Sequence, residues 1–305
     1  MRQYFFLVLT VSVLILGLAG CEVNKATGRS QFVPLGWDWE IALGAEAQPE
    51  LAREYGGSVQ DPRLVAYVND IGHRLARHTV NEVPNLPWEF TLLDSDVINA
   101  FALPGGKVFF SRGLAARLTD EAQMALVLGH EIGHVTARHG AERLSQTLVA
   151  QLGAELAGSV LSGQGGWGEL TAYVVGQGAG AYLLKFNRDQ ESEADRLGMR
   201  YMVMEGYDPS AIRDVMRILA EASSGQRQPE FLSTHPYPET RISQGNRLLA
   251  NEYAHTQNNP NYGRFADRYQ RQFLRYLAEL PPSPDIDGFA LMRPSTWCMH
   301  CALGE

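Results

Sequence analysis

A chain of 305 residues, 45% of them hydrophobic, is long enough to bury a sizeable core. Its formal net charge of −8 argues against nucleic acid as a partner, because nucleic-acid binding relies on a surplus of Lys and Arg. No repeat period or low-complexity tract stands out in the sequence. The composition therefore favours a globular protein that acts on something other than nucleic acid.

The first 20 residues have the pattern of a targeting segment. Arg2 gives a basic start, and the apolar run over residues 5–18 is shorter than the roughly 20 residues that a membrane span needs. The run ends in Leu18-Ala19-Gly20-Cys21, which resembles the bacterial lipoprotein signal. We therefore expect a signal peptide over residues 1–20 and a lipid on Cys21 that holds the protein at a membrane. An ordinary signal peptide or a retained anchor is the alternative.

The residue after this cysteine bears on the destination. Glu22, rather than aspartate, follows Cys21. By resemblance to enterobacterial sorting, this favours the periplasmic side of the outer membrane over the inner membrane. The remaining cysteines, Cys298 and Cys301, are expected to form a disulfide in an oxidising compartment, with free thiols as the alternative.

Apolar spacing predicts helices on either side of a small sheet. After a polar stretch, Trp37, Trp39 and Ile41 are candidate packing residues of a first helix, and residues 61–78 form a stronger amphipathic pattern. Residues 88–93 and 107–111 are typical of strands, and a Pro-Gly-Gly turn precedes the second strand.

Residues 119–140 predict a helix that contains His130-Glu131-Ile132-Gly133-His134. Thr119 is the expected N-cap, and Asp120 and Glu121 add negative charge to the first turn, where the helix dipole favours it. This helix is the centre of the functional prediction.

The H-E-x-x-H spacing indicates a metal site. His130 and His134 lie one turn apart on one helix face, so both rings can reach a single metal ion. Glu131 points sideways from the pair and can take a proton from a water molecule, as a zinc peptidase requires. A solvated face that carries two histidines by chance is the alternative, and the metal hypothesis needs a third ligand.

The stretch over residues 140–186 is rich in Ala, Gly, Leu and Val and has a Gly-rich break. It predicts two apolar helices joined by a loop. We expect the pair to pack on the core, with a lid over a cleft, or a surface for lipid or a partner, as the alternative.

Residues 188–206 supply a candidate third ligand. Glu191 and Asp195 stand one helical turn apart. Glu191 would complete a His, His, Glu set with an open position, and Asp195 would accept the free ring N–H of a ligating histidine. A charged, exposed helix face is the alternative, and Glu193, which points away from Glu191, fits it.

A metzincin site would instead take its third histidine from residue 140, but Gly140 stands there. His139 falls one residue short of that position. We therefore expect His139 to be a structural histidine, or one that supports a ligand, rather than a ligand itself.

Four pieces of the sequence, in this order, resemble one family of gluzincin metallopeptidases. They are Asn99-Ala100-Phe101-Ala102-Leu103-Pro104-Gly105-Gly106, His130-Glu131-Ile132-Gly133-His134, Glu191-Ser192-Glu193-Ala194-Asp195 and Ser233-Thr234-His235-Pro236. The family contains the CAAX prenyl endopeptidase, HtpX, BepA and LoiP, and the periplasmic members are the most similar. The resemblance covers about residues 30–250, and four motifs in register are far more specific than H-E-x-x-H alone.

The resemblance implies one Zn²⁺ ion per chain, bound by His130, His134 and Glu191, with Glu131 as the catalytic base and acid. It also implies that His235 is catalytic and lies near the metal, either as a switch on the metal or as a group that stabilises the reaction intermediate. A structural histidine at a helix start is the alternative for His235.

The sheet next to the metal helix is the expected substrate-binding element. A free strand edge can pair with an extended peptide backbone, so Asn99, Ala100, Phe101 and Ala102 are the candidate residues. A hairpin that only packs against the helix is the alternative. Arg241 is expected to position a carboxylate or the substrate.

The expected fold is α+β and predominantly α-helical, a zincin-like metallopeptidase domain with a small β-sheet beside the H-E-x-x-H helix. Four segments are expected: a signal peptide (1–20), a lipidated N-terminus and tether (21–35), the zinc metallopeptidase domain (36–250) and a C-terminal helical extension and tail (251–305). No tetratricopeptide repeat period follows Arg241.

The expected function is zinc-dependent endoproteolysis by a lipoprotein in the bacterial periplasm. By resemblance, the substrates are unfolded, misfolded or stalled envelope proteins, which makes the protein part of protein quality control. The alternative is a chaperone or assembly factor whose protease site is largely autoinhibited. A third possibility is a lipoprotein in which zinc is only structural.

Overall fold

The computed structural model describes residues 21–147, 185–223, 229–236 and 238–284. The expectations for residues 1–20, for most of the apolar pair after residue 147, and for Cys298 and Cys301 therefore lie outside the described residues.

A three-stranded sheet lies at the centre of the described chain. Its strands are β3 (Glu89–Leu93), β4 (Ala100–Leu103) and β5 (Lys107–Ser111), in the order β3-β5-β4. A turn in which Gly105 and Gly106 both have positive φ joins β4 and β5 as an antiparallel pair, whereas β3 runs parallel to β5. This order leaves β4 at an edge of the sheet.

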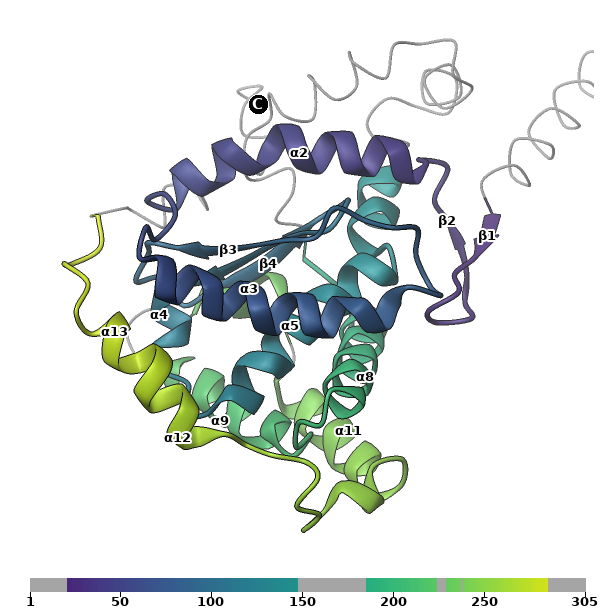
Figure 1. Ribbon diagram of the computed structural model, residues 1–305. Helices are drawn as coiled ribbons and strands as arrows, with labels where there is room; N and C mark the ends of the chain where they lie inside the picture. The colour runs from purple at the N-terminus through teal and green to yellow at the C-terminus, as the bar shows by residue number, and fades with distance from the viewer. Residues whose placement is uncertain (1–20, 148–184, 224–228, 237, 285–305) are drawn as a thin grey trace, which may run out of the picture.

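Helices cover both faces of this sheet (Figure 1). On one face, α2 (Trp37–Glu54) packs Ala47 and Leu51 against Phe101, Leu103 and Phe109. On the other, α3 (Pro62–Ala76) and α5 (Glu121–Thr136) share the main core with Phe90, Val108 and Phe110. Because successive side chains of a strand point to opposite faces, the sheet contributes to a hydrophobic core on each face.

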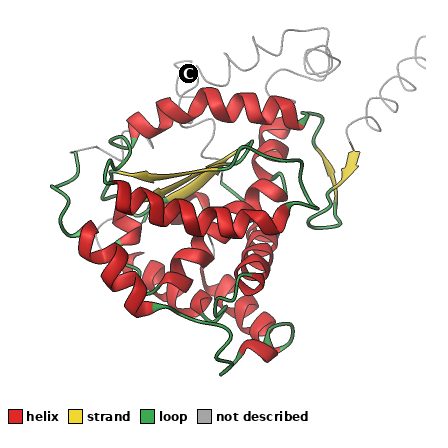
Figure 2. Cartoon of the chain, in the orientation of Figure 1, coloured by secondary structure: helices red, strands yellow, loops and turns green. Residues whose placement is uncertain are grey.

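Figure 2 shows that helix predominates over strand, as expected for this α+β fold. The remaining helical segments are α4 (Arg112–Ala115), α8 (Arg188–Met204), α9 (Ala211–Ser223), α10 (Phe231–Thr234), α11 (Pro238–Ala250), the 3₁₀ turns η1 (Arg77–Thr79) and η3 (Ala254–Thr256), and one continuous helix made of α12 (Ala266–Tyr269), the π-helical η4 (Gln270–Leu274) and α13 (Arg275–Leu277).

The predicted metal helix is shorter at both ends than expected. Asp120, rather than Thr119, is its N-cap, because the Asp120 side chain accepts a hydrogen bond from the backbone N–H of Gln123 at 2.9 Å. The helix ends at Thr136, and Arg138 turns the chain with a φ of 57° before residues 139–147 continue as a separate helical segment.

Close packing of α5 on α8 brings the two predicted motifs together. Gly198 in α8 lies against α5 so tightly that a Cβ atom there would stand 2.7 Å from the backbone nitrogen of His130. Gly133 in α5 has the same relation to α8, since its Cβ would stand 2.9 Å from the Ala194 carbonyl oxygen. Small residues at this crossing therefore allow α8 to present its carboxylates to the histidines of α5.

The N-terminal part of the described chain is folded onto the body. Strands β1 (Cys21–Val23) and β2 (Ser30–Phe32) form an antiparallel pair, and the Asn24 side chain donates to the carbonyl of Thr136 at 2.9 Å. Part of the segment expected as a tether thus contacts the end of α5, because a polar turn can supply the partner that a helix end lacks.

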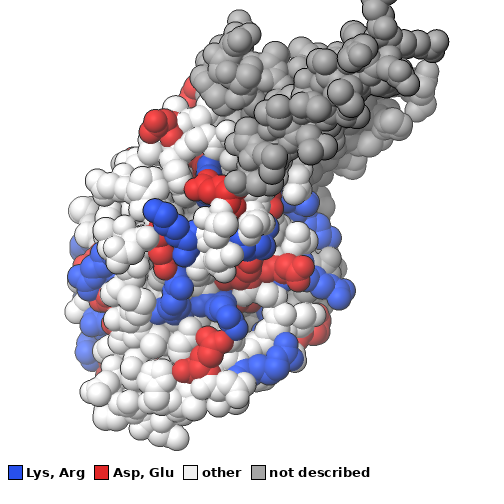
Figure 3. Space-filling view, turned by 90° about the vertical axis from the view of Figure 1, so that its right-hand side faces the viewer, with Lys and Arg blue, Asp and Glu red and all other residues white. Residues whose placement is uncertain are grey.

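One face of the molecule carries both positive and negative side chains. On the face shown in Figure 3, Lys and Arg side chains are interspersed with Asp and Glu side chains. Among the described residues, no helix combines the length and the apolar character needed to cross a bilayer.

Candidate metal centre

Two buried histidines of α5 form the base of the site. His130 and His134 are 1% and 3% exposed, and their Nε2 atoms lie 3.0 Å apart. This geometry follows from their spacing of one helical turn, which the sequence predicts. Burial holds the pKa of His134 well below its usual value, so this ring is neutral and can offer a lone pair.

Glu191 of α8 is the third member of the cluster. Its Oε1 atom lies 3.4 Å from Nε2 of His134, and its Oε2 atom lies 3.6 Å from Nε2 of His130. Burial opposes ionisation of this carboxyl, but the neighbouring His235 and Arg241 hold its pKa well below the usual range. Glu191 is therefore available as an anionic oxygen donor.

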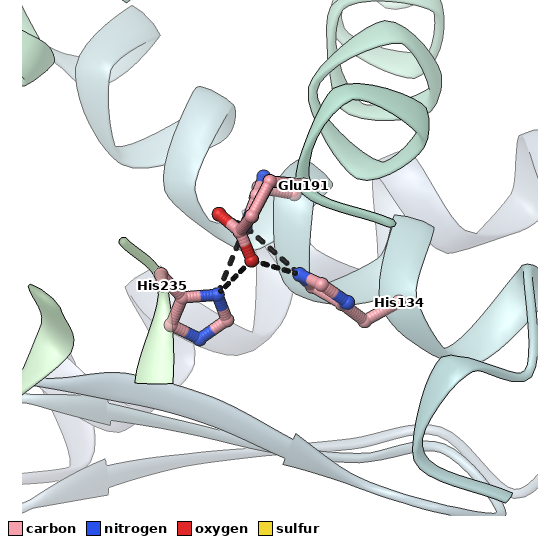
Figure 4. Close-up of side chains that lie close together, drawn as sticks. His134, Glu191 and His235 are labelled. Atoms are coloured by element: carbon pink, nitrogen blue, oxygen red, sulfur yellow. Dashed lines mark hydrogen bonds and ion pairs between the residues drawn. The ribbon is translucent and has the colours of Figure 1, made fainter. Parts of the chain in front are cut away.

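His235 supplies a fourth donor from outside the helix pair. It follows α10, and its Nδ1 atom lies 3.0 Å from Oε1 of Glu191 and 3.2 Å from Nε2 of His130. Figure 4 shows His134 and His235 on two sides of the Glu191 carboxylate. Phe231 stacks on the His235 ring with centroids 4.4 Å apart, which fixes that ring in the interior.

The donor atoms fit a single metal ion. One ligand atom from each of His130, His134, Glu191 and His235 lies within 4.8 Å of all the others. A tetrahedron with metal-to-ligand distances of about 2.0–2.1 Å has edges of about 3.3–3.5 Å, and the contacts between nitrogen and oxygen atoms of these four residues span 3.0–3.6 Å. Three imidazole nitrogens and one carboxylate oxygen suit a divalent transition metal.

Glu131 lies beside this cluster rather than in it. Neither of its carboxylate oxygens has a hydrogen-bond partner among the described residues, although the side chain is fully buried. Its Oε1 atom lies 3.6 Å from Nε2 of His235. Burial raises the pKa of Glu131, which makes this carboxylate more basic than an exposed one.

The outer nitrogen of His130 contacts Asp195. The Nδ1–Oδ1 distance is 2.9 Å, and Arg241 binds both oxygens of Asp195 at 2.6 and 2.8 Å. Arg241 also lies 3.0 Å from Oε2 of Glu191. The structure therefore gives Arg241 the role of positioning carboxylates, one of the two roles expected from the sequence.

The outer nitrogen of His134 contacts His139, as expected of a histidine that supports a ligand. The two Nδ1 atoms lie 2.9 Å apart. His139 Nε2 lies 3.0 Å from Glu193 Oε2, and Arg29 donates from Nε to Glu193 at 3.2 Å. Glu193 and Arg29 are not predicted from the sequence, because Glu193 fits a solvent-exposed helix face there and no local pattern relates Arg29 to α8.

Burial and neighbouring charges shift the pKa values of His139 and Glu193. Burial lowers the pKa of His139, although the Glu193 carboxylate opposes the shift. Burial also opposes ionisation of Glu193, but the hydrogen bond from His139 and the charge of Arg29 lower its pKa overall. Both shifts favour a neutral imidazole beside an ionised carboxylate.

The residues expected to bind substrate lie mostly inside the protein. Asn99 and Ala100 are 0% exposed and Phe101 is 4% exposed, whereas Ala102 is partly exposed. The Asn99 side chain donates to Glu230 at 3.0 Å instead of facing a cleft. Any contact of this segment with substrate must therefore come mainly from the backbone of β4.

Comparison with known proteins gives a family for this arrangement. The model of peptidase family M48 matches residues 62–248, a range that contains every donor of the cluster. The chain belongs to peptidase family M48. The M48 match also includes Glu131, Asp195, His139 and Glu193, whereas Arg29 lies before it.

Curated relatives of this M48 chain come from bacteria and from mitochondria. The beta-barrel assembly-enhancing protease of Escherichia coli K12 is 36% identical over 216 residues, which cover 67% of this chain and 43% of the relative. That of Yersinia pestis is 35% identical, covering 71% and 45%. The mitochondrial metalloendopeptidase OMA1 of Schizosaccharomyces pombe is 31% identical, covering 72% and 64%. The chain thus spans less than half the length of these two bacterial relatives.

Proposed function

We propose that the protein is a zinc-dependent endopeptidase. The observation that carries this proposal is the buried set of four donor atoms with the Glu131 carboxylate beside it, whose oxygens have no hydrogen-bond partner among the described residues. Buried carboxylate oxygens without hydrogen bonds are costly, so they are expected where a reaction uses them. Membership of family M48 supports the same chemistry.

His130, His134 and Glu191 would hold the metal, with His130 and Glu191 both steadied through Arg241. A zinc ion bound there would supply Lewis acidity toward the peptide carbonyl and lower the pKa of a water molecule. Glu131 would accept the proton of the attacking water at its carboxylate and deliver it to the leaving amine. Its raised pKa favours both transfers.

His235 is proposed to control this site. Its Nδ1 atom stands where a fourth ligand would be, so substrate and water would enter only after residues 231–236 move. In the open state, the same ring could stabilise the developing negative charge on the substrate, which would make His235 a catalytic residue.

The backbone of β4 is the proposed guide for substrate. This strand is an edge of its sheet and lies against α5, so an extended peptide could pair beside the histidines. Such pairing uses main-chain groups of Ala100, Phe101 and Ala102 and is largely indifferent to sequence. It would suit unfolded or misfolded proteins as substrates.

The proposed location is the periplasmic side of the bacterial outer membrane. A lipid on Cys21 would be the anchor, and clearance of misfolded or stalled envelope proteins would be the role. The names of the bacterial relatives, which refer to beta-barrel assembly, support an envelope setting. Replacing Cys21 with Ala and following incorporation of labelled palmitate would test the anchor, since the proposal requires the label and membrane association to be lost together.

A chaperone or assembly factor is the second candidate, and the position of His235 favours it. A site closed by its own fourth ligand would bind unfolded chains without cutting them. Incubation of the full chain with an unfolded model protein, with zinc and with a chelator, separates the two. Zinc-dependent fragments would support the peptidase, whereas suppressed aggregation without fragments under both conditions would support the chaperone.

A further inference from the structure

The two histidines of α5 differ in what supports their outer nitrogens. His130 meets a carboxylate directly, because Nδ1 lies 2.9 Å from Asp195. His134 meets a second imidazole, whose Nδ1 lies 2.9 Å away, and that imidazole in turn reaches Glu193 at 3.0 Å. Both supports end on the same helix, since Asp195 and Glu193 belong to α8.

We propose that His139 is a positioning residue that fixes the ring of His134, and that Glu193, held by Arg29, fixes the tautomer of His139. This inference rests on the metal centre proposed above. It assigns a role in that centre to three residues outside the donor set.

Hydrogen-bond chemistry gives the chain of contacts one direction. An ionised carboxylate only accepts, so the His139 nitrogen that faces Glu193, Nε2, must carry a proton. In a neutral ring, Nδ1 of His139 is then an acceptor. The Nδ1 atom of His134 must therefore donate to it, which leaves Nε2 of His134 with a lone pair.

The same direction follows from the other end. The Nε2 atom of His134 faces His130 and Glu191 in the donor set, and a neutral imidazole that binds a metal through Nε2 carries its proton on Nδ1. That proton needs an acceptor, and His139 Nδ1 is the one in contact. The metal-facing nitrogen of His134 and the carboxylate of Glu193 therefore require the same tautomers of His134 and His139.

Packing makes the arrangement rigid. His139 is 0% exposed, and Phe186 stacks on the His134 ring with centroids 3.9 Å apart. Arg29 holds Glu193 and also binds Glu142 at 2.8 and 2.9 Å, so it links the segment after β1 to this support. Arg29 thus connects the loop of the β1–β2 hairpin to the support of His134.

Two matched carboxylates allow a sharp test. Glu193 and Glu142 both pair with Arg29, but only Glu193 contacts His139. If the contacts only anchor the hairpin, Glu193→Leu and Glu142→Leu should behave alike. If Glu193 sets the tautomer of His139, Glu193→Leu alone should change metal binding, because leucine leaves Nε2 of His139 without its acceptor.

The readout is the zinc dissociation constant of the full chain, measured by competition with a chromogenic chelator, with the visible spectrum of the Co²⁺ form as a second probe. We expect His139→Leu to weaken zinc binding roughly 10- to 100-fold. His139→Asn, whose amide oxygen can accept from His134, should recover part of the loss. Glu193→Leu should weaken binding and alter the spectrum, and Glu142→Leu should do neither.

Unchanged zinc affinity and an unchanged spectrum in both His139→Leu and Glu193→Leu would overturn this inference and leave the proposed function standing. Equal effects of Glu193→Leu and Glu142→Leu would also overturn it. A wild-type chain that binds no zinc would overturn the metal centre as well. If His139→Leu does not fold, the comparison of Glu193→Leu with Glu142→Leu decides, because Glu193 is partly exposed.

Discussion

The Asp195 carboxylate lies 2.9 Å from Nδ1 of His130, and both side chains are buried. Arg241 binds the same carboxylate and also faces Glu191. One arginine thus connects Asp195, which contacts His130, with Glu191 of the donor set. Two members of the donor set are therefore contacted by residues that do not belong to that set.

Replacement of Asp195 with Asn should weaken zinc binding by roughly 10- to 100-fold. The Asn amide would lack the negative charge of the Asp195 carboxylate, which both His130 and Arg241 contact. Competition with a chelator measures the effect, and Asp189→Asn is the control, because Asp189 is exposed on the first turn of the same helix. Equal zinc affinity in the two variants would contradict the prediction.

Replacement of His235 with Ala should increase cleavage of an unfolded protein while it weakens zinc binding. The reason is that Nδ1 of His235 lies 3.0 Å from Glu191, in the position of a fourth ligand. His255→Ala is the control, since His255 is exposed and outside the donor set. A loss of cleavage at full zinc occupancy would instead show that His235 acts in catalysis more than in closure.

Replacement of Gly198 with Ala should destabilise the protein by about 1–3 kcal/mol and also weaken zinc binding. The new Cβ would stand 2.7 Å from the backbone nitrogen of His130, so α8 must move away from α5. Urea unfolding measures the first effect. Gly140→Ala serves as the control, because its Cβ would have no neighbour nearer than 3.6 Å; similar losses in both variants would rule out the explanation.

The buried Glu230 carboxyl should make the folded protein less stable as the pH rises. Burial raises its pKa to about 7, although hydrogen bonds from Tyr55 and Asn99 oppose the shift. In the unfolded chain the pKa of this carboxyl is 4.5. The stability that the protonated Glu230 side chain contributes is therefore full below about pH 4.5 and is lost as the pH rises through about 7.

Glu230→Gln should therefore match the wild type near pH 4.5 and be more stable than it at pH 8, by on the order of 3 kcal/mol. The amide oxygen can still accept from Tyr55 and Asn99, so the contacts at this end of α10 are retained. Thermal unfolding at several pH values measures the difference, with the exposed Glu239→Gln as control. A difference that shrinks with rising pH would have the wrong sign.

Local patterns in the sequence predicted the parts of the site that depend on local geometry. The pairs His130 with His134 and Glu191 with Asp195 each follow from one helical turn. The strand over residues 89–93 follows from side-chain alternation, and the strand over residues 107–111 follows from its place after the Pro-Gly-Gly turn. The N-cap at Asp120 was missed because Thr119 and Asp120 are both good caps, and only the backbone bend decides between them.

Contacts between distant segments could not be predicted in this way. Arg29 contacts Glu193, 164 residues further along the chain, and the Asn99 side chain turns inward to Glu230 instead of toward substrate. Such pairs depend on how α8 and α10 pack, and periodicity in one segment says nothing about that packing. The resemblance to a family predicts that His235 lies near the metal, and in the structure the Nδ1 atom of His235 faces Glu191 of the donor set.

The most direct test of the account is the cleavage of an unfolded model protein by the full chain and by its Glu131→Gln variant, both loaded with equal zinc. A second pair makes the same comparison in chains that also carry His235→Ala. The account predicts unchanged zinc content and a loss of cleavage of at least roughly 100-fold when Glu131 is replaced. Cleavage at an undiminished rate in the Glu131→Gln variants would contradict it.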